Sequence, residues 1–204
     1  PNNPTGFYLS KQELKLLITN VPKKIIIIID AAYSEYVTDK DYSNGIDFAK
    51  RHKNIIVTRT FSKIFGLASL RLGWCYAHND IIQLMNKVRG PFNINQIAQT
   101  AGVEALKDKK YVKNSINHNK FWLRKMNNEL SKLPIQVCDS RANFLLLNIG
   151  KSVKILNRFL LSKSVIVRLM DKYNLPQYIR VSIGTSKENK KFIKSMKEFF
   201  NGKK

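Results

Sequence analysis

One short segment, residues 24–30, limits the fold of this chain more than any other. Five consecutive isoleucines, Ile25–Ile29, end at Asp30. A continuous apolar run of this length, closed by an acid, is typical of a parallel strand that is buried on both faces of a sheet. The run is far too short to span a bilayer, and we expect no membrane association. The segment therefore predicts a layered α/β domain.

The order of the predicted elements extends this expectation to the whole chain. Strands predicted over 54–57 and 71–77 are separated from the first strand by helices or long loops, which favours a mostly parallel sheet. A long amphipathic helix is predicted over 111–133, and short strands alternate with helices after it. This change of character predicts two domains, 1–115 and 116–204, of which the second is a small α+β unit.

The charge of the chain is strongly basic, with 36 Lys and Arg against 14 Asp and Glu and a formal net charge of +22. Such a charge suggests binding to nucleic acid or to an anionic membrane. However, only nine of the basic residues are arginines, the lysines are spread along the chain, and no DNA- or RNA-binding motif is present. We therefore expect no nucleic-acid function. A basic binding module remains the alternative to an enzyme, and it should gather its lysines on one face.

The cysteines and histidines give no sign of a metal or redox site. Cys75 and Cys138 lie in apolar surroundings and lack C-x-x-C spacing. Two free thiols without a signal peptide indicate a reducing cytoplasm. His52, His78 and His118 lie far apart without the spacing of metal ligands, so we predict no metal site.

The clearest chemical pattern surrounds Lys63. This lysine lies in an apolar, glycine-containing loop after a predicted strand, with Thr60 and Ser62 before it and Arg71 eight residues after it. A desolvated amine is nucleophilic toward a carbonyl, and hydroxyls with an arginine suit a phosphate dianion. The pattern is that of a lysine that forms a Schiff base beside an anchored cofactor phosphate. In a lysine-rich chain, an ordinary surface lysine is the alternative.

A resemblance to a known family covers essentially the whole chain. Residues 59–73 resemble the cofactor-lysine segment of histidinol-phosphate aminotransferases, which are fold type I enzymes that use pyridoxal 5'-phosphate (PLP). Further segments match that family's motifs in the same order: 1–6 (Pro-Asn-Asn-Pro-Thr-Gly), 30–33, 87–95, 142–146, 165–168 and 175–185. The resemblance implies that residues 1–115 form the C-terminal part of the large PLP-binding domain. Because the family's first strands have no counterpart here, we expect the chain to be part of a longer protein.

The resemblance also implies roles for seven cofactor-binding residues. Lys63 would carry PLP covalently and move a proton during the reaction. Asp30 would pair with the pyridinium nitrogen, which lets the ring act as an electron sink; alternatively, it caps the following turn. Tyr33 and Asn3 would hydrogen-bond the phenolic oxygen of the cofactor. The phosphate would be held by Thr60, Ser62 and Arg71.

On the substrate side, the resemblance implies that Arg180 binds the substrate anion, as a planar guanidinium suited to carboxylate or phosphate. Arg168 is a second candidate for this anion, with a solvated strand-end arginine as its alternative. Asn143 would contact the substrate or serve only as a polar residue at the start of a strand. The chain departs from the family pattern at Ala31, where a glutamate is usual, and at Gly90 and Leu169, where proline is usual.

The implied reaction is transamination between histidinol phosphate and 2-oxoglutarate, in histidine biosynthesis, by a homodimeric enzyme. Two related activities remain open because the pocket that reads the substrate side chain is not visible in the sequence: transamination of aromatic amino acids, and decarboxylation of threonine phosphate. A non-catalytic basic module on the same scaffold is the alternative from another class. We also expect that the 204-residue chain alone has little activity.

Overall fold

The computed structural model describes residues 1–202, and the chain divides into two compact units. The first unit is Tyr8–Ile116, and the second unit combines Pro1–Phe7 with Asn117–Lys204. The helix α5 (Lys109–Leu130) contributes to both units. The division into domains 1–115 and 116–204 stays a prediction. The sequence did not indicate that residues 1–7 belong with the second unit.

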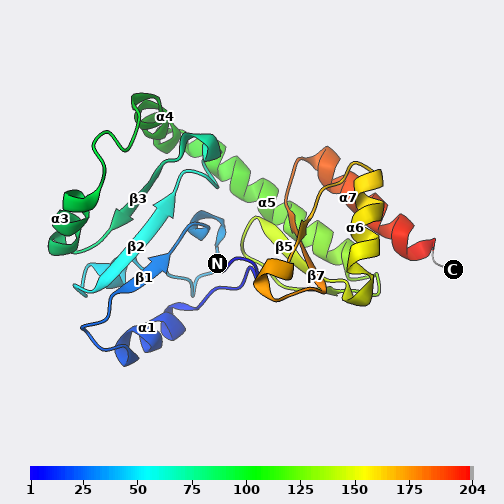
Figure 1. Cartoon of the computed structure of the whole chain (residues 1–204), viewed down its shortest axis with the longest axis horizontal. Coiled ribbons are helices and arrows are strands. Elements are labelled where there is room, and N and C mark those ends of the chain that lie inside the picture. Colours follow the sequence, from blue (N-terminus) through cyan, green and yellow to red (C-terminus); the bar gives the residue numbers. More distant parts are fainter. Residues whose placement is uncertain (203–204) are drawn as a thin grey trace. The chain divides into compact units, whose positions relative to one another are not determined.

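The first unit is built on a three-stranded mixed sheet (Figure 1). The order is β1–β2–β3, with β1 parallel to β2 and β3 antiparallel to β2. The predicted α/β class is confirmed, but the sheet is mixed rather than mostly parallel. The elements of this unit are β1 (Ile27–Asp30), β2 (Ile55–Thr60), β3 (Gly73–Tyr76), α1 (Lys11–Asn20), α2 (Ile46–Ala49), α3 (Asn79–Val88), α4 (Gln96–Lys107) and the start of α5.

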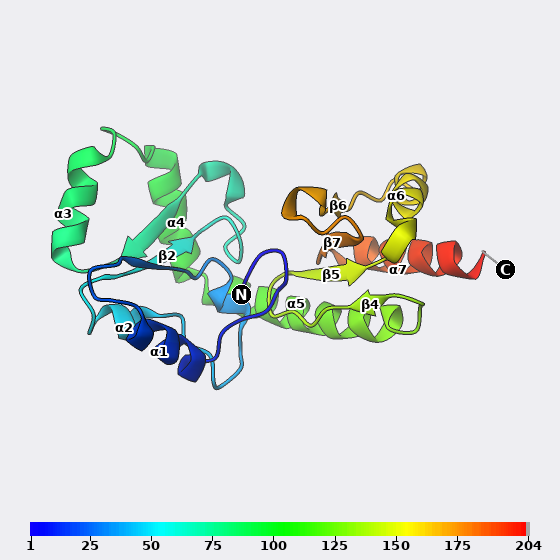
Figure 2. The ribbon, with the colours of Figure 1, turned by 60° about the horizontal axis from the view of Figure 1, so that its bottom comes forward.

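The core of the first unit lies on one face of this sheet. The helices α1 and α2 lie side by side there and pack against β1 and β2 (Figure 2). Inward-facing side chains of β2, Ile55 and Val57, are completely buried. On the other face Ile28 is 64% exposed. The prediction that residues 24–30 are buried on both faces is therefore wrong for the described chain, because no described element covers the second face of β1.

Local signals in the sequence explain where α1 begins and ends. The Ser10 side chain accepts a hydrogen bond from the backbone of Glu13, and the Glu13 carboxylate accepts one from the backbone of Ser10. This capping box, predicted from the sequence, satisfies amide groups that the first helical turn leaves without partners. The helix ends at Asn20, just before Val21 and Pro22, as expected from the proline.

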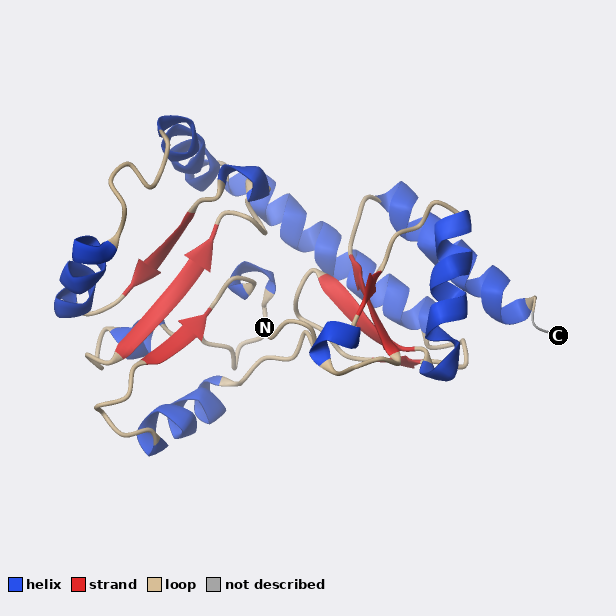
Figure 3. Ribbon diagram, viewed as in Figure 1, coloured by secondary structure: helices blue, strands red, loops and turns tan. Residues whose placement is uncertain are grey.

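The second unit is a four-stranded antiparallel sheet packed against helices (Figure 3). The strand order is β4–β5–β7–β6. Apolar side chains of β5 and β7 and of three helices, α5, α6 and α7, form one buried core, in which Met126, Leu156 and Met196 are fully buried. This is the α+β arrangement predicted for the C-terminal part. Its elements are β4 (Gln136–Val137), β5 (Phe144–Asn148), α6 (Val153–Ser162), β6 (Arg168–Leu169), β7 (Tyr178–Ser182), α7 (Ser186–Asn201) and most of α5.

Two further properties concern the part of the chain that the structure describes. None of the helices within residues 1–202 is both long and apolar enough to cross a membrane. The same residues bring no group of three or more His, Cys, Asp or Glu side chains close enough together to hold a metal ion.

Candidate active site

The loop that carries Lys63 follows directly after β2 and is anchored by buried apolar residues. Phe61 is 5% and Ile64 1% exposed, and backbone hydrogen bonds join Phe61 to Leu72 and to Leu67. Between these anchors Lys63 is only partly exposed. Its Nζ lies 5.3 Å from the centre of the Tyr33 ring, in the geometry of a cation–π contact. The structure therefore brings together two of the predicted site residues, Lys63 and Tyr33.

Two glycines in or beside this loop lie in close contact with neighbouring atoms. Gly66 has a φ of +71°, and a Cβ placed there would lie 2.8 Å from the hydroxyl oxygen of Tyr111. A Cβ on Gly73 would lie 2.8 Å from the carbonyl oxygen of Arg59 on the neighbouring strand. Only glycine fits these positions without displacement. The conformation of the loop therefore depends on glycine at positions 66 and 73, as well as on the apolar anchors.

The three predicted phosphate ligands form a connected group at the base of the loop. The backbone N–H of Ser62 donates to Thr60 Oγ1 at 3.0 Å. Arg71 Nη1 donates to Ser62 Oγ at 3.4 Å and to the carbonyl oxygen of Ala68 at 2.8 Å. Arg71 adopts a left-handed backbone conformation, with φ of 54°. Two hydroxyls and a guanidinium converge here, and these groups suit a phosphate.

Asp30 is the last residue of β1, and its side chain is exposed. Its Oδ1 accepts hydrogen bonds from Thr58 Oγ1 at 3.5 Å and from the Ala32 backbone at 3.1 Å. The second bond is the turn-capping contact that the sequence offered as an alternative role. Because capping uses one oxygen, the other carboxylate oxygen stays available to a ligand. Asp30 lies at the C-terminal end of a parallel strand, where ligands of α/β sheets bind.

In the second unit, Arg180 is held by two contacts. Its Nη1 donates to Asn3 Oδ1, and its guanidinium carbon lies 4.9 Å from the centre of the Phe144 ring. The Nε of Arg180 is buried and has no hydrogen-bond partner among the described residues. A buried guanidinium nitrogen without a partner is costly, and an anion would satisfy it. Asn3 thus contacts the predicted substrate arginine. Phe144 was not predicted as a site residue.

Arg168 lies directly opposite Arg180 across the β6–β7 pair. Residues paired in this way point to the same face of a sheet, so two positive charges share that face. Both arginines line a cavity of about 650 Å³ within the second unit, together with Ser182, Gly184 and Glu188. Arg168 also packs over Tyr173, at 5.9 Å from its ring centre. The backbone carbonyl of Asn143 accepts a hydrogen bond from the Ile183 N–H at 2.8 Å.

The predicted site residues thus fall into two groups. Six belong to the first unit: Asp30, Tyr33, Thr60, Ser62, Lys63 and Arg71. Four belong to the second: Asn3, Asn143, Arg168 and Arg180. Contacts join Lys63 to Tyr33, Ser62 to Thr60 and Arg71, and Asn3 to Arg180, while Arg168 faces Arg180. The roles of all ten residues stay predictions.

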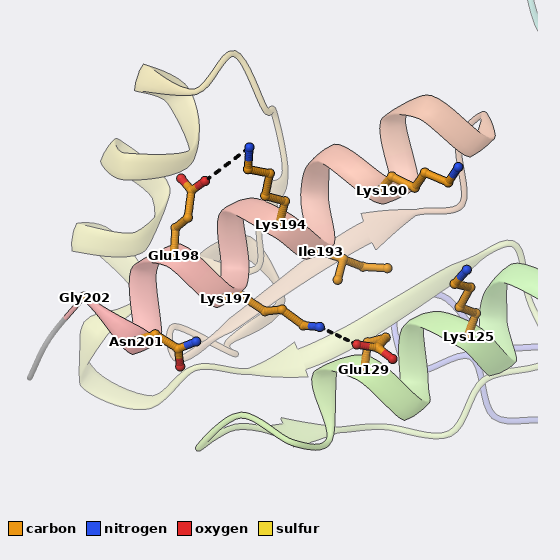
Figure 4. Close-up of a pocket in the computed structure, with 9 residues that line it drawn as sticks. All are labelled: Lys125, Glu129, Lys190, Ile193, Lys194, Lys197, Glu198, Asn201 and Gly202. Carbon is orange, nitrogen blue, oxygen red and sulfur yellow. Dashed lines mark hydrogen bonds and ion pairs between the residues drawn. The ribbon is translucent and has the colours of Figure 1, made fainter.

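A larger cavity, of about 780 Å³, lies elsewhere in the second unit, between α5 and α7 (Figure 4). Ion pairs join Lys197 to Glu129 and Lys194 to Glu198 along this groove. It contains no predicted site residue and is open to solvent, so size alone does not identify the site. The residues that line it are Lys125, Glu129, Lys190, Ile193, Lys194, Lys197, Glu198, Asn201 and Gly202.

The structure also shows an ion pair that the sequence did not reveal. Arg59 and Glu35 are paired in the first unit, and each side chain is only 14% exposed. Tyr42 lies close to this pair, and burial raises the pKa of Tyr42 to about 12, although the charge of Arg59 opposes the change. Burial likewise raises the pKa of Tyr36 above its usual range.

The fold of both units agrees with that of solved aminotransferases. A histidinol-phosphate aminotransferase from Clostridium acetobutylicum superposes with a TM-score of 0.92 at 27% identity, covering 99% of this chain and 62% of that one. Another from Sinorhizobium meliloti, solved in complex with PLP, has a TM-score of 0.90 at 23% identity and covers 99% and 56%. The fold class is that of the PLP-dependent aminotransferases.

The sequence family is equally clear. The family model for aminotransferase class I and II matches residues 1–196, so the chain belongs to this family. A histidinol-phosphate aminotransferase from Pelagibacter ubique is 47% identical over 98% of this chain. The chain spans 57% of the length of that relative.

Proposed function

We propose that this chain is part of a PLP-dependent aminotransferase whose substrate is histidinol phosphate. The observation that carries the proposal is the lysine loop of the first unit. A partly buried lysine, Lys63, lies beside Tyr33 and next to a connected group of phosphate-binding side chains. Family membership and the 47% identical relative support the reaction class and the substrate.

The residues of the first unit fit the chemical groups of PLP. Thr60, Ser62 and Arg71 supply hydroxyl and guanidinium donors for the phosphate. Asp30 supplies a carboxylate for the ring nitrogen, and Lys63 supplies the amine. When bound, PLP supplies an electron sink that makes the Cα proton of an amino acid acidic.

Each of these side chains then has a defined task. Lys63 would hold the cofactor through its amine, with loss of water from the cofactor aldehyde, and would carry the proton that leaves Cα. Asp30 would face the ring nitrogen with its carboxylate. Tyr33 would donate a hydrogen bond to the phenolic oxygen. Arg71 would hold the phosphate and so help to orient the cofactor toward Lys63.

In the second unit, Arg180 binds the anionic end of the substrate. Its buried Nε, which has no hydrogen-bond partner among residues 1–202, and the facing charge of Arg168 both favour an anion on this face of the sheet. Asn3 orients Arg180 through their hydrogen bond. Asn143, the residue before β5, is proposed to contact the substrate on the strength of the family resemblance alone. A planar fork with a second arginine is suited to the dianion of a phosphate ester.

We further propose that the enzyme is a homodimer and acts in the cytoplasm. The two cysteines, Cys75 and Cys138, are free thiols in the structure, which suits a reducing compartment.

A comparison of three candidate substrates tests the proposal. The longer protein of which this chain is a part is loaded with PLP and 2-oxoglutarate, and glutamate is measured after separate addition of histidinol phosphate, phenylalanine or threonine phosphate. We expect glutamate from histidinol phosphate at the lowest substrate concentration. Faster turnover of phenylalanine would mean that the substrate is an aromatic amino acid and not histidinol phosphate. Loss of carbon dioxide from threonine phosphate would make the enzyme a decarboxylase.

A further inference from the structure

The buried ion pair of the first unit joins two segments that carry site residues. Glu35 belongs to a 3₁₀ turn, Ser34–Tyr36, that follows β1. Arg59 belongs to β2. Their side chains form an ion pair, and each is 14% exposed. The proposed function above assigns no task to either residue.

The position of Arg59 explains why its charge is buried. Side chains two residues apart on a strand point to the same face, so Arg59 continues the inward row of Ile55 and Val57. It is paired with Trp74 in the sheet register, and its guanidinium carbon lies 5.3 Å from the centre of the Trp74 ring. The Nε of Arg59 is buried and has no hydrogen-bond partner among the described residues. Glu35 is therefore the acidic group that compensates this charge.

Stability alone gives little reason for such a pair. Removing two charges from water costs several kcal/mol, and a well-packed apolar pair in the same place is often equally stable or better. The rest of the inward row is already apolar, so an apolar residue at position 59 would extend the core. A buried ion pair in such a place is more readily explained by the two chain segments that it holds together.

The two segments that the pair joins are those of Tyr33 and Lys63. Glu35 is two residues beyond Tyr33, and Arg59 is four residues before Lys63. Tyr33 is 7% exposed, and Lys63 Nζ lies 5.3 Å from its ring centre. No strand pairing links these two residues directly, because the β1–β2 register ends at Asp30 and Thr58. Beyond that point the ion pair ties the two chain segments together.

We propose that Glu35 and Arg59 are positioning residues that hold Tyr33 against Lys63. The pair acts on the site through the backbone of the 3₁₀ turn and of the end of β2, not by touching substrate or cofactor. This inference rests on the proposed role of Lys63. Loss of either charge lets Tyr33 and Lys63 move apart, and an amine that has lost its geometry reacts more slowly with the aldehyde of PLP.

The test measures how fast PLP labels Lys63 in the 204-residue chain. The protein is mixed with PLP and reduced with borohydride, and the labelled peptides are quantified by mass spectrometry. The variants are Glu35→Gln and Arg59→Met, which remove one charge each, and Arg59→Lys, which keeps the charge. Glu104→Gln is the matched control, because it breaks an exposed ion pair with Lys107 in the same unit.

We expect labelling of Lys63 to fall about tenfold in Glu35→Gln and in Arg59→Met, since small displacements of reacting groups have effects of this order or larger. Arg59→Lys should keep most of the wild-type rate, and Glu104→Gln should match wild type. If Glu35→Gln does not fold, as judged by circular dichroism, Glu35→Asp takes its place, with a smaller loss expected because the carboxylate is retained but drawn back. Wild-type labelling of Lys63 in a folded charge-removing variant would overturn the proposal.

Hydrogen exchange of the cofactor-free protein separates positioning from general stability. Charge removal should speed exchange in residues 61–67 while leaving α1 unchanged. Faster exchange throughout the first unit would mean that the pair only stabilises the fold, and the proposal would be wrong. If wild-type Lys63 is not labelled, the proposed function fails for this chain. In that case, hydrogen exchange of residues 61–67 in Glu35→Gln still tests the positioning role of the ion pair. Unchanged exchange refutes this role, and locally faster exchange supports it.

Discussion

Replacement of Gly73 by alanine should destabilise the first unit and disturb the lysine loop. The added Cβ would lie 2.8 Å from the carbonyl oxygen of Arg59, and both the glycine and this oxygen are held by the β2–β3 pairing. Close C···O contacts in sheets are about 3.3 Å, so the new methyl group is about 0.5 Å too near. Because the obstacle is backbone, no side-chain rotation relieves it, and the strands must separate.

The expected penalty is about 1–3 kcal/mol, the usual range for overpacking a well-packed site. In a unit of about 100 residues, each kcal/mol lowers the melting temperature by roughly 4–8 °C. The strand shift also reaches Thr60, which is paired with Gly73, so PLP labelling of Lys63 should fall as well. Melting is followed by circular dichroism, and the labelled peptides are counted as for the ion-pair variants.

Gly90→Ala is the matched control for this change. No heavy atom lies within 4 Å of a Cβ built on Gly90. The same substitution at an open site usually leaves stability unchanged or raises it by about 0.4–1 kcal/mol. If Gly73→Ala has the same melting temperature as Gly90→Ala and keeps its Lys63 labelling, then β2 and β3 do not approach each other as closely at Gly73 as described.

Three further predictions concern the core, a helix cap and the phosphate group. Leu156→Ala should lower the free energy of unfolding by about 2–5 kcal/mol, because this side chain is fully buried; Ile155→Ala, 58% exposed, should change it far less in urea titrations. Glu188 caps α7 through Thr185, and these hydrogen bonds lower its pKa. The Glu188 carboxylate thus stabilises the fold above its usual pKa of 4.5, and this stabilisation is lost as the pH falls through the lowered pKa. The urea midpoints of wild type and Glu188→Gln should therefore converge in acid. A difference between the two midpoints that does not change with pH would contradict this. Arg71→Ala should weaken labelling of Lys63 by PLP about tenfold or more, the effect of losing a charge-assisted hydrogen bond, while labelling by pyridoxal, which lacks the phosphate, stays as in wild type. Equal losses with both aldehydes would mean that Arg71 does not hold the phosphate.

The parts of the fold that were predicted correctly depend on local signals. The capping box of Ser10 and Glu13, the proline after α1 and the helical spacing of α5 act within one or two turns, so the sequence reveals them. The pairing of β3 depends on tertiary contacts, and its antiparallel direction was missed. The exposed second face of β1 was also missed, since an apolar run indicates that a strand is suited to burial, not what covers it.

The same distinction applies to the candidate site. The pattern around Lys63 predicted the neighbours that the structure brings together, because Thr60, Ser62 and Arg71 lie within a single loop and its flanks. The ion pair of Glu35 and Arg59 gave no signal. In a chain with 36 basic residues, an arginine in a polar-looking stretch is indistinguishable from a solvated one until its partner is known. Only its place in the inward row of β2, next to Ile55 and Val57, could have indicated burial.

The proposed function depends above all on Lys63 as the lysine that carries PLP. The most direct test is reduction of a mixture of the protein and PLP with borohydride, followed by mass mapping of the labelled peptide in wild type and in Lys63→Ala. We expect one dominant adduct, on Lys63, that disappears in the variant while the background labelling of surface lysines is unchanged. A dominant adduct on another lysine, or labelling spread evenly over the lysines of a folded protein, would contradict it.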